Sequence, residues 1–358
     1  MRLNFCTLFN SNYLTRGLAM YESLVKHSRD FHLYIFAFDA KTHEIILKLN
    51  LSHTTVIPLD KFEDEALLKV KPTRTQTEYC WTCTPSVIRY SIETYHLDSC
   101  TYLDADLFFF SDPKVLIEEM GSDSVLITEH RYTQEYDISA SSGKYCVQFM
   151  TFKSDERGMK VLNWWRDSCI EWCFARQEDG KNGDQKYLDD WTTRFEGIHE
   201  LQHIGGGVAI WNLQQYKFTK KEDRLFLKQP DAKEFVELVF FHFQSLAFYS
   251  EGIVKLAPAY AYRIPKKVIM DIYVPYISRL MELKNEIGKI DSSFDPNGSN
   301  IEISKHRPRT WKYLFYHYKQ FLFSLNFKKM LNAIKESESY HYYYLKEGPI
   351  KPGKSWIN

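Results

Sequence analysis

The chain has 358 residues, of which 46 are basic and 46 acidic, so its balanced charge excludes the global signature of a nucleic-acid-binding protein. This length suffices for one large core, or for a domain of about 250 residues with an appendage. No apolar run reaches the roughly 20 residues of a membrane span, and the apolar stretch after Arg2 is too short for a signal peptide. Seven scattered cysteines, an odd number, indicate a reducing compartment, so we expect a cytoplasmic protein.

Short apolar runs alternate along the chain with stretches of helical periodicity, the pattern of β-α-β units. The predicted strands are 3–9, 31–38, 54–58, 101–103, 124–128 and 145–152. The predicted helices are 12–27, 41–49, 85–95 and 158–174. This alternation predicts an α/β fold with a mostly parallel sheet covered by helices.

Two carboxylates interrupt the apolar run that begins at Thr101 and reads Thr-Tyr-Leu-Asp-Ala-Asp-Leu-Phe-Phe-Phe. An ionised carboxylate at the end of such a run is costly unless it is paired or bound to a metal. Asp104 and Asp106 have the spacing that turns two side chains to the same side of a strand end, which is where open α/β sheets bind ligands. The pair therefore predicts a divalent-cation site. The alternative is a capped turn with two solvated acids.

Five segments, in this order, resemble those of GT-A glycosyltransferases, closest to the family-8 type and the wider nucleotide-diphospho-sugar transferase group. They are Cys6-Thr-Leu-Phe-Asn-Ser-Asn-Tyr13 with the helix that follows, Pro85-Ser-Val-Ile-Arg-Tyr90, Tyr102-Leu-Asp-Ala-Asp106, Gly183-Asp-Gln-Lys-Tyr-Leu188 and His242-Phe243. The resemblance covers roughly residues 1 to 260. It implies a GT-A, Rossmann-like fold in which a mixed, mostly parallel sheet is flanked by helices, within a nucleotide-sugar-binding catalytic domain of residues 1–265.

The same resemblance implies roles for individual residues. The residues that would bind the donor nucleotide are Thr7, Asn12, Tyr13, Arg89 and Asp104. The residues that would act at the sugar are Asp184 and Gln185. The metal ligands would be Asp104, Asp106 and His242.

Each of these assignments competes with a plainer interpretation. His242 stands in an apolar run and is also compatible with a satisfied core histidine, whereas Arg89 could form a surface ion pair with Glu93 four residues on. Asp184 could simply cap a helix. The family implies retention of anomeric configuration, although Asp189 or Asp190 could instead serve as the general base of an inverting enzyme.

Glycosyl transfer explains why a metal would be needed. Breaking the bond between the anomeric carbon and a nucleoside diphosphate builds negative charge on the leaving oxygens, which a divalent cation stabilises. Two carboxylates and one imidazole suit Mn²⁺ and tolerate Mg²⁺. The expected partners are a nucleotide-sugar donor, most simply a uridine diphosphate sugar, and a glycan or lipid-linked acceptor hydroxyl.

The sequence departs from the family pattern after His242. The family continues there with a glycine and a Lys-Pro-Trp segment whose lysine meets the diphosphate, whereas this chain reads Phe-Gln-Ser-Leu-Ala-Phe-Tyr. Lys255 could substitute for that lysine, but its spacing differs. The segment Gly205-Gly-Gly-Val-Ala-Ile-Trp-Asn-Leu213 resembles a glycine-then-Trp-Asn segment of the wider group, which would put flexible backbone near a sugar; the alternative is a loop that enters a strand.

The sequence changes character beyond residue 265, where we expect a helical, basic-aromatic extension, 266–358. A long helix is predicted over 267–289, and a polar linker over 291–300. Residues 305–335 then contain eight lysines and arginines, no acid and many aromatic residues. This composition is typical of a helix attracted to anionic lipid, which would place the enzyme on the cytoplasmic face of the inner membrane in bacterial surface polysaccharide or lipopolysaccharide synthesis. The same composition would also suit a helix docked on the catalytic domain or a nucleic-acid surface.

Two other functions compete with glycosyl transfer. A sugar-nucleotide nucleotidyltransferase would share the α/β sheet and the acidic metal site, but it would need a glycine-rich phosphate loop with basic residues, which the segment 7–13 lacks. An inert peripheral-membrane scaffold would need only the C-terminal segment. The Asp104, Asp106 and His242 set argues against the scaffold.

Overall fold

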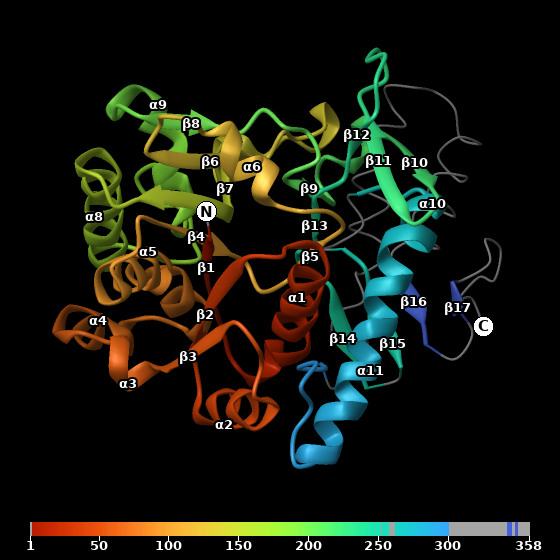
Figure 1. Ribbon diagram of the computed structural model, residues 1–358, viewed down its shortest axis with the longest axis horizontal. Coiled ribbons are helices and arrows are strands. Elements are labelled where there is room, and N and C mark those ends of the chain that lie inside the picture. Colours follow the sequence, from red (N-terminus) through yellow and green to blue (C-terminus); the bar gives the residue numbers. More distant parts are fainter. Residues whose placement is uncertain (1, 251, 258–261, 301–341, 346–347, 350–358) are drawn as a thin grey trace.

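The computed structural model describes residues 2–250, 252–257, 262–300, 342–345 and 348–349. Its centre is a seven-stranded sheet in the order β3-β2-β1-β4-β7-β6-β8 (Figure 1). The strands are β1 (Leu3–Phe9), β2 (Phe31–Ala37), β3 (Thr54–Pro58), β4 (Ser99–Leu103), β6 (Val125–Glu129), β7 (Tyr145–Lys153) and β8 (Ile198–Glu200). All pairs are parallel except the two made by β7, so the sheet is mixed and mostly parallel, as predicted.

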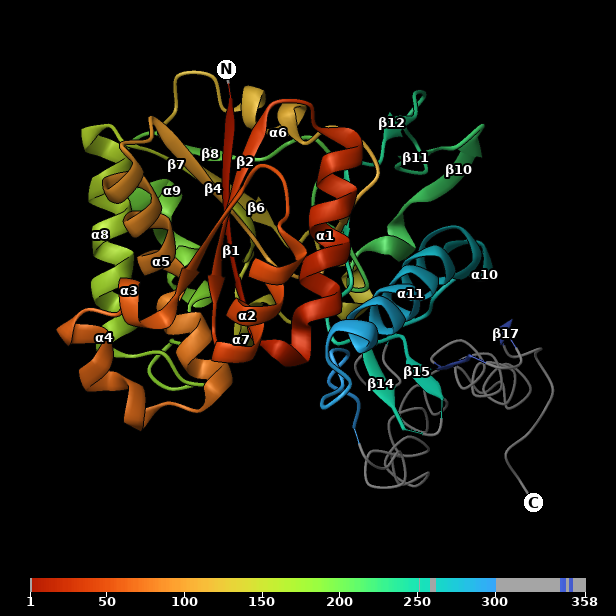
Figure 2. The ribbon, with the colours of Figure 1, turned by 60° about the horizontal axis from the view of Figure 1, so that its bottom comes forward.

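Helices cover both faces of this sheet (Figure 2). The helices of the N-terminal half are α1 (Leu14–His27), α2 (Ala40–Leu49), α3 (Leu59–Phe62), α4 (Glu65–Val70), α5 (Gln76–Tyr95) and α6 (Lys114–Glu119). Those that follow are α7 (Ser139–Ser142), α8 (Glu156–Glu171), α9 (Trp191–Arg194), α10 (Lys266–Val268) and α11 (Val274–Ile290). A π-helical turn, Ile269–Tyr273, joins α10 to α11, and these three together confirm the helix predicted over 267–289.

Two hydrophobic clusters fill the space between the sheet and its helices. The first contains Leu18 of α1 and Ile45 of α2, and it continues to Leu280 of α11. The second contains Val87 of α5 and Trp165 of α8, which packs against Phe152 and Trp191. The alternation of apolar strands and amphipathic helices in the sequence thus corresponds to a sheet that is buried on both faces.

Smaller sheets extend the molecule beyond the central one. One has the order β5-β13-β9 and consists of β5 (Leu107–Phe109), β13 (Phe240–His242) and β9 (Val208–Ala209). A second consists of β10 (Lys217–Lys221), β11 (Arg224–Lys228) and β12 (Val236–Glu237). A third consists of β14 (Ala247–Tyr249), β15 (Ile253–Lys255), β16 (Tyr342–Tyr344) and β17 (Gly348–Pro349).

Helix α5 begins nine residues earlier than the sequence predicts. Thr75 caps it, because its hydroxyl accepts from the backbone of Glu78 while the Glu78 carboxylate accepts from the Thr75 backbone. Pro85, the first residue of the helix predicted from the sequence, lies inside α5. The capping box therefore decides where this helix starts, and it brings an extra two turns of α5 to the cleft described below.

The segment 291–300, predicted as a polar linker, packs against the N-terminal part of the chain instead. Thr15 of α1 donates from its backbone to the carbonyl of Pro296 over 3.3 Å, and Asn297 is fully buried. Lys41 of α2 forms an ion pair with Asp291 at 2.6 Å. The prediction failed because composition reports polarity, whereas a polar side chain can also be buried when its hydrogen bonds are made.

The basic-aromatic segment 305–335 lies outside the described residues. Within the described residues, no helix combines the length and the apolar character that crossing a membrane requires. All seven cysteines belong to the described part of the chain, and they are free thiols.

Candidate active site

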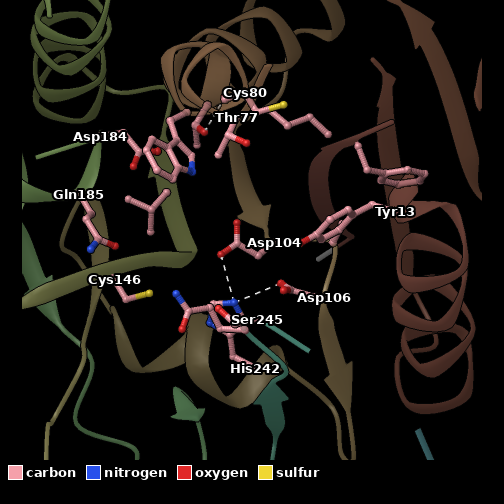
Figure 3. A pocket seen from close by; sticks show the side chains of 18 of the residues that line it. Tyr13, Thr77, Cys80, Asp104, Asp106, Cys146, Asp184, Gln185, His242 and Ser245 are labelled. Carbon is pink, nitrogen blue, oxygen red and sulfur yellow. Dashed lines mark hydrogen bonds and ion pairs between the residues drawn. The ribbon is translucent and has the colours of Figure 1, made fainter. Parts of the chain in front are cut away.

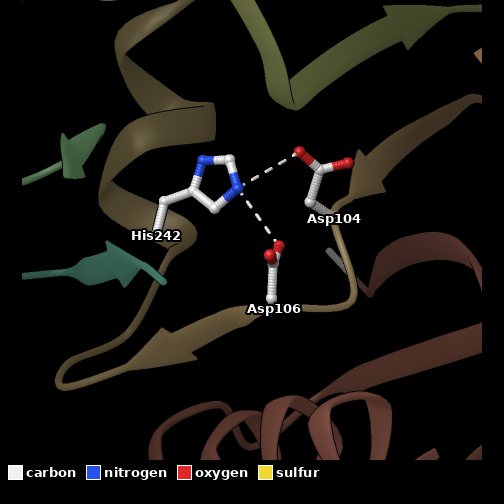
Figure 4. A group of neighbouring side chains, drawn as sticks. All are labelled: Asp104, Asp106 and His242. Atoms are coloured by element: carbon white, nitrogen blue, oxygen red, sulfur yellow. Dashed lines mark ion pairs between the residues drawn. The ribbon is translucent and has the colours of Figure 1, made fainter. Parts of the chain in front are cut away.

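Asp104, Asp106 and His242 come together at the junction of the central sheet and the β5-β13-β9 sheet. The Nε2 atom of His242 lies 3.1 Å from a carboxylate oxygen of Asp106 and 3.6 Å from one of Asp104 (Figure 4). One possible ligand atom from each residue lies within 4.8 Å of the others. The late histidine that the sequence singled out is therefore part of the same cluster as the two aspartates.

Backbone pairing explains why these distant residues meet. In the antiparallel pair of β5 and β13, His242 lies opposite Leu107, the residue after Asp106. Phe243, the residue that follows β13, donates its N–H to the carbonyl of Asp106 over 3.0 Å. The N–H of Asp104 donates to the carbonyl of Gln148 in β7 over 3.0 Å, which fixes the other aspartate at the end of β4.

Gln148 and Trp211 fix the orientation of the His242 ring. Its Nδ1 atom lies 2.9 Å from Oε1 of Gln148, so the amide oxygen accepts the Nδ1 proton. Its ring also meets the Trp211 ring edge to face at 5.4 Å. Nε2 is thereby directed at the two carboxylates, as a metal-binding histidine needs.

Burial and charge act against each other in this cluster. Burial raises the pKa of Asp104 to about 6, against the lowering effect of His242. Burial would also raise the pKa of Asp106, but the charge and the hydrogen bond of His242 bring it below its usual value. Burial would lower the pKa of His242, but the carboxylate of Asp106 and its hydrogen bond raise it well above the ordinary value. The two acids therefore require a positive charge beside them.

The donor set fits a divalent cation. Two carboxylates and an imidazole nitrogen are ligands that Mn²⁺ accepts and Mg²⁺ tolerates. One ligand atom from each residue lies within 4.8 Å of the others, which is close enough for a single ion to contact all three. Tyr102 supports the arrangement, because its hydroxyl donates to Asp104 over 3.0 Å. Asp104, Asp106 and His242 would hold the ion.

These three residues line a cleft of about 940 Å³, a volume typical of small-molecule sites. Figure 3 shows Tyr13 on one side of the Asp104 carboxylate, and Asp184 and Gln185 on the other. Asn12 also lines the cleft beside Tyr13. Four of the residues assigned from the sequence to donor binding and catalysis thus lie around the candidate metal site.

Asp184 is buried on the far side of the cleft from Tyr13. Burial, with the nearby Asp104 charge, raises its pKa to about 7, although a hydrogen bond with Thr84 opposes this. Asp184 stands at the N-cap position of the 3-10 helix Gln185–Asp190, as its plainer interpretation predicted, but its side chain makes no capping hydrogen bond. Gln185 donates its amide N–H to the carbonyl of Ser142 over 2.6 Å, which leaves its amide oxygen to face the cleft.

Two residues assigned to nucleotide binding lie elsewhere. Thr7 is fully buried inside β1, and its hydroxyl has no hydrogen-bond partner among the described residues. Arg89 does not line the cleft; its Nε donates to Glu93 over 2.8 Å on the exposed side of α5. Arg89 therefore forms the surface ion pair that its plainer interpretation predicted. Residues four apart lie about one helical turn apart, which brings the side chains of Arg89 and Glu93 together.

The two aspartates considered as a general base, and the lysine considered as a diphosphate ligand, also lie away from the cleft. Asp189 accepts from the Lys144 backbone and from the Lys186 amine, and Asp190 pairs with Arg194. Neither aspartate lines the cleft, so the geometry offers no support for a base at either position. Lys255 lies in β15 and does not line the cleft either.

The glycine segment enters the small sheet, as its plainer interpretation predicted. A Cβ atom on Gly205 would lie 2.1 Å from the carbonyl oxygen of Glu237, so only glycine permits this approach. The segment then delivers Trp211 to the cleft. Trp211 packs on both His242 and His130, and its indole N–H donates to the carbonyl of His130.

Sequence reasoning missed several parts of the cleft wall. They are Thr77, Cys80, Trp81, Thr84, His130, Tyr132, Gln244, Ser245, Asp295, Gly298 and Ser299. The first four belong to the early turns of α5, which the capping box of Thr75 and Glu78 could have revealed. The rest have no local signal, because they face the cleft only after the chain has folded around it.

Comparison with known proteins gives a clear relationship in sequence. No protein-family model matches the chain. YfnD of Bacillus subtilis strain 168, an uncharacterized protein, is 31% identical over 308 residues, which are 85% of this chain and 95% of YfnD. The chain belongs to the family of YfnD. YfnF of the same organism, also uncharacterized, is 31% identical over 259 residues, which cover 70% of this chain and 84% of YfnF.

Solved structures that resemble the chain are glycosyltransferases. GlyE of Streptococcus pneumoniae TIGR4 matches with a TM-score of 0.35 and 14% identity over 56% of this chain and 45% of GlyE. The chain thus spans less than half the length of that structure. The galactosyltransferase LgtC, as an active-site mutant, matches with a TM-score of 0.41 and 10% identity over 68% of this chain and 88% of LgtC.

Proposed function

We propose that the chain is a divalent-metal-dependent glycosyltransferase that moves a sugar from a nucleoside-diphosphate donor to a hydroxyl of a glycan or glycolipid. The main support is the position of Asp104, Asp106 and His242 in the wall of a cleft of about 940 Å³. Placing the half-buried Asp104 beside the buried Asp106 and His242 has little structural purpose, since burying such charges is costly. The three residues have a clear chemical purpose if a doubly charged ion and a diphosphate bind beside them.

Different residues of the cleft would bind the diphosphate, the nucleoside and the sugar of the donor. Bound Mn²⁺ or Mg²⁺ would supply positive charge to the leaving diphosphate. Tyr13 and Asn12 would hold the nucleoside, because they lie on one side of the metal ligands. Asp184 and the amide oxygen of Gln185 would hold the sugar on the other side.

The state of Asp184 suits a sugar-binding role. With its pKa raised to about 7 by burial, this carboxyl keeps its proton over part of the neutral range. It can then donate to one sugar hydroxyl and accept from another. We infer retention of configuration from the resemblance to the family-8 type. Asp189 and Asp190, the two residues considered from the sequence as an inverting base, do not line the cleft.

The decisive experiment is a donor panel assayed for nucleoside diphosphate release with Mn²⁺, with and without a chelator. Asp106→Ala should abolish turnover, whereas Asp167→Ala, whose side chain is 77% exposed, should retain it. With chelator present, the melting temperatures of Asp106→Ala and Asp167→Ala should equal that of the wild type. Donor turnover that survives both chelation and Asp106→Ala would contradict a metal-dependent mechanism.

The donor is proposed to be a uridine diphosphate sugar. Tyr13 offers an aromatic face and Asn12 an amide for the base. Calorimetry in the presence of Mn²⁺ should show tighter binding of uridine diphosphate than of guanosine diphosphate. The reverse order would rule out the uridine assignment and leave the metal site untouched.

We further propose that residues 305–335, which lie outside the described part of the chain, bring the enzyme to an anionic membrane during bacterial surface polysaccharide or lipopolysaccharide synthesis. The support is compositional, because the segment has eight positive charges and no acid, and each charge near an anionic surface is worth about 1 kcal/mol. Full-length protein should bind anionic liposomes at low salt and detach as salt rises. Protein truncated before Lys305 should not bind them. Indifference of the full-length protein to anionic liposomes would favour a docked segment.

A further inference from the structure

The segment 291–300 returns from the end of α11 to the entrance of the cleft. Asp295, Gly298 and Ser299 line the cleft together with Asn12 and Tyr13. The first three follow α11, whereas Asn12 and Tyr13 belong to the loop between β1 and α1. The cleft wall on this side is therefore complete only when residues 291–300, here called the return segment, are docked on the N-terminal loop.

A group of buried hydrogen bonds holds the return segment in place. The Thr15 hydroxyl donates to Oδ1 of Asn297 over 2.6 Å and reaches the carbonyl of Pro296 at 3.3 Å. Both Thr15 and Asn297 are fully buried. A hydrogen bond between two such groups is shielded from water, so leaving one of them unpaired carries the full desolvation penalty.

Arg16 adds a second set of contacts from the same helix. One guanidinium nitrogen donates to the carbonyls of Asn12 and Asn297, at 3.2 and 3.0 Å, and another donates to the carbonyl of Leu246 at 2.9 Å. The guanidinium also lies 4.5 Å from the centre of the Tyr13 ring. One buried side chain thus connects the N-terminal loop, the return segment and the turn after His242.

Gly298 permits the closest approach of the two segments. Its φ of +59° is in the left-handed region, and a Cβ atom there would lie 2.7 Å from the carbonyl oxygen of Asn12. Any other residue would push the return segment away from the N-terminal loop. Asp295 is fixed beside it by an ion pair with Lys284 at 2.9 Å and by the backbone N–H of Asn297 at 3.0 Å.

The return segment lies at one particular end of the cleft. Tyr13, to which it is joined through Arg16, stands on the opposite side of Asp104 from Asp184 and Gln185 (Figure 3). With the diphosphate at the metal ligands and the sugar at Asp184, the remaining part of the donor is its nucleoside. The Ser299 hydroxyl hydrogen-bonds the Asp295 carboxylate there, and both side chains line the cleft. A hydroxyl and a carboxylate retain acceptor positions that suit ribose hydroxyls and base amides.

We propose that the return segment forms part of the nucleoside-binding wall, and that Thr15, Arg16 and Asn297 are positioning residues that latch it onto the N-terminal loop. The inference rests on the proposed function, since it needs a nucleoside diphosphate in the cleft.

The test compares uridine diphosphate with inorganic pyrophosphate, both titrated calorimetrically with Mn²⁺ present. Thr15→Val preserves side-chain shape but removes the hydrogen bond to Asn297, and Asn297→Ala removes the other partner. Both should weaken binding of uridine diphosphate by about tenfold, and leave binding of pyrophosphate and of Mn²⁺ alone within a factor of about two. Ser292→Ala, an exposed position of the same segment, is the matched control and should bind uridine diphosphate as the wild type does.

A second variant tests the wall without disturbing the latch. Ser299→Trp places a large ring in the cleft from the return segment, so it should block uridine diphosphate and spare pyrophosphate. Hydrogen exchange should also show slower exchange of the amides of 297–299 when uridine diphosphate binds to the wild type.

The outcomes separate the two proposals. If the wild type binds pyrophosphate and uridine diphosphate equally well and Ser299→Trp changes neither, the nucleoside-wall inference is overturned while the metal site stands. Equal loss of both ligands in Thr15→Val would also overturn it, because the segment would then act on the diphosphate. If the wild type binds no nucleoside diphosphate of any base with Mn²⁺, both the inference and the proposed function are overturned.

Discussion

The cleft has carboxylates in two places: the proposed metal corner, formed by Asp104, Asp106 and His242, and the proposed sugar corner, formed by Asp184 and Gln185. The surroundings stabilise the carboxylates of the two corners in different ways. At the metal corner, the charge of His242 lowers the pKa of Asp106 despite burial, so this acid is an anion with a cationic neighbour. At the sugar corner, burial raises the pKa of Asp184 to about 7, so this acid approaches neutrality. The comparison teaches that a buried carboxylate is tolerated either beside a positive charge or with its own proton.

This difference matches what each corner would bind. Under the proposed function, the residues that need a positive charge beside them would bind the metal ion and the diphosphate. A corner whose acid is nearly neutral is prepared for uncharged hydroxyl groups, which a protonated carboxyl can both donate to and accept from. The two corners share the Asp104 charge, which contributes to the raised pKa of Asp184.

Removing the His242 imidazole should have the largest effect, because it should weaken metal binding. His242→Leu removes the imidazole ligand and leaves only Asp104 and Asp106 to hold the ion, so we expect Mn²⁺-dependent turnover to fall by about 100- to 1,000-fold. Steady-state kinetics over a Mn²⁺ titration measures this. His53→Asn, which removes an exposed imidazole at a left-handed turn position that asparagine tolerates, serves as the control. Turnover within a factor of about two of the wild type would exclude His242 as a ligand.

Loosening the support of His242 should weaken the same corner by less. Gln148→Leu removes the acceptor for Nδ1, so the imidazole loses its fixed orientation while all three ligands remain. Loss of such a supporting partner typically reduces metal affinity by about 10- to 100-fold. Mn²⁺ titration followed by electron paramagnetic resonance measures the free ion. Undiminished affinity would show that β13 alone orients the ring.

The sugar corner should reveal itself in the pH dependence of stability. The folded state keeps the Asp184 proton up to about pH 7, whereas the unfolded chain loses it near pH 4. The folded state therefore binds more protons between these values, and stability falls as the pH rises through this window. In Asp184→Asn, with chelator present, the loss of unfolding free energy between pH 5 and pH 7 should be smaller by roughly 2 kcal/mol.

Urea denaturation at both pH values tests this, and Asp98→Asn, an exposed acid, is the comparison variant. An identical pH slope for the wild type and Asp184→Asn would mean that Asp184 is ionised throughout. The distinction between the two corners would then fail.

The smallest effect on stability and donor binding is expected for Arg89, which lies outside both corners. Arg89→Ala removes an exposed ion pair with Glu93, so stability should change by less than about 1 kcal/mol and donor affinity should not change. Thermal melting and calorimetry with a nucleoside diphosphate test the two statements. A marked loss of donor affinity would return Arg89 to the donor site and contradict its placement on the outer side of α5.

Local sequence determined much of the molecule. The β-α-β alternation gave the parallel strands β1 to β4 and the helices between them, because periodicity records which side of an element faces a core. The Asp104 and Asp106 pair, His242, Asp184, Gln185, Asn12 and Tyr13 all stand in short motifs, and the structure gathers them around one cleft. Arg89 was misplaced because a motif does not show which face of a helix meets the ligand.

The tertiary structure alone decided the rest. Composition predicted a linker over 291–300, yet Asn297 is fully buried against Thr15, a residue from the other end of the chain. His130 reaches the cleft in the same way, from the end of β6, a strand that is paired only in the folded protein. The physical reason is that hydrophobic periodicity is encoded locally, whereas the partner of a buried polar group depends on which distant segment the fold brings beside it.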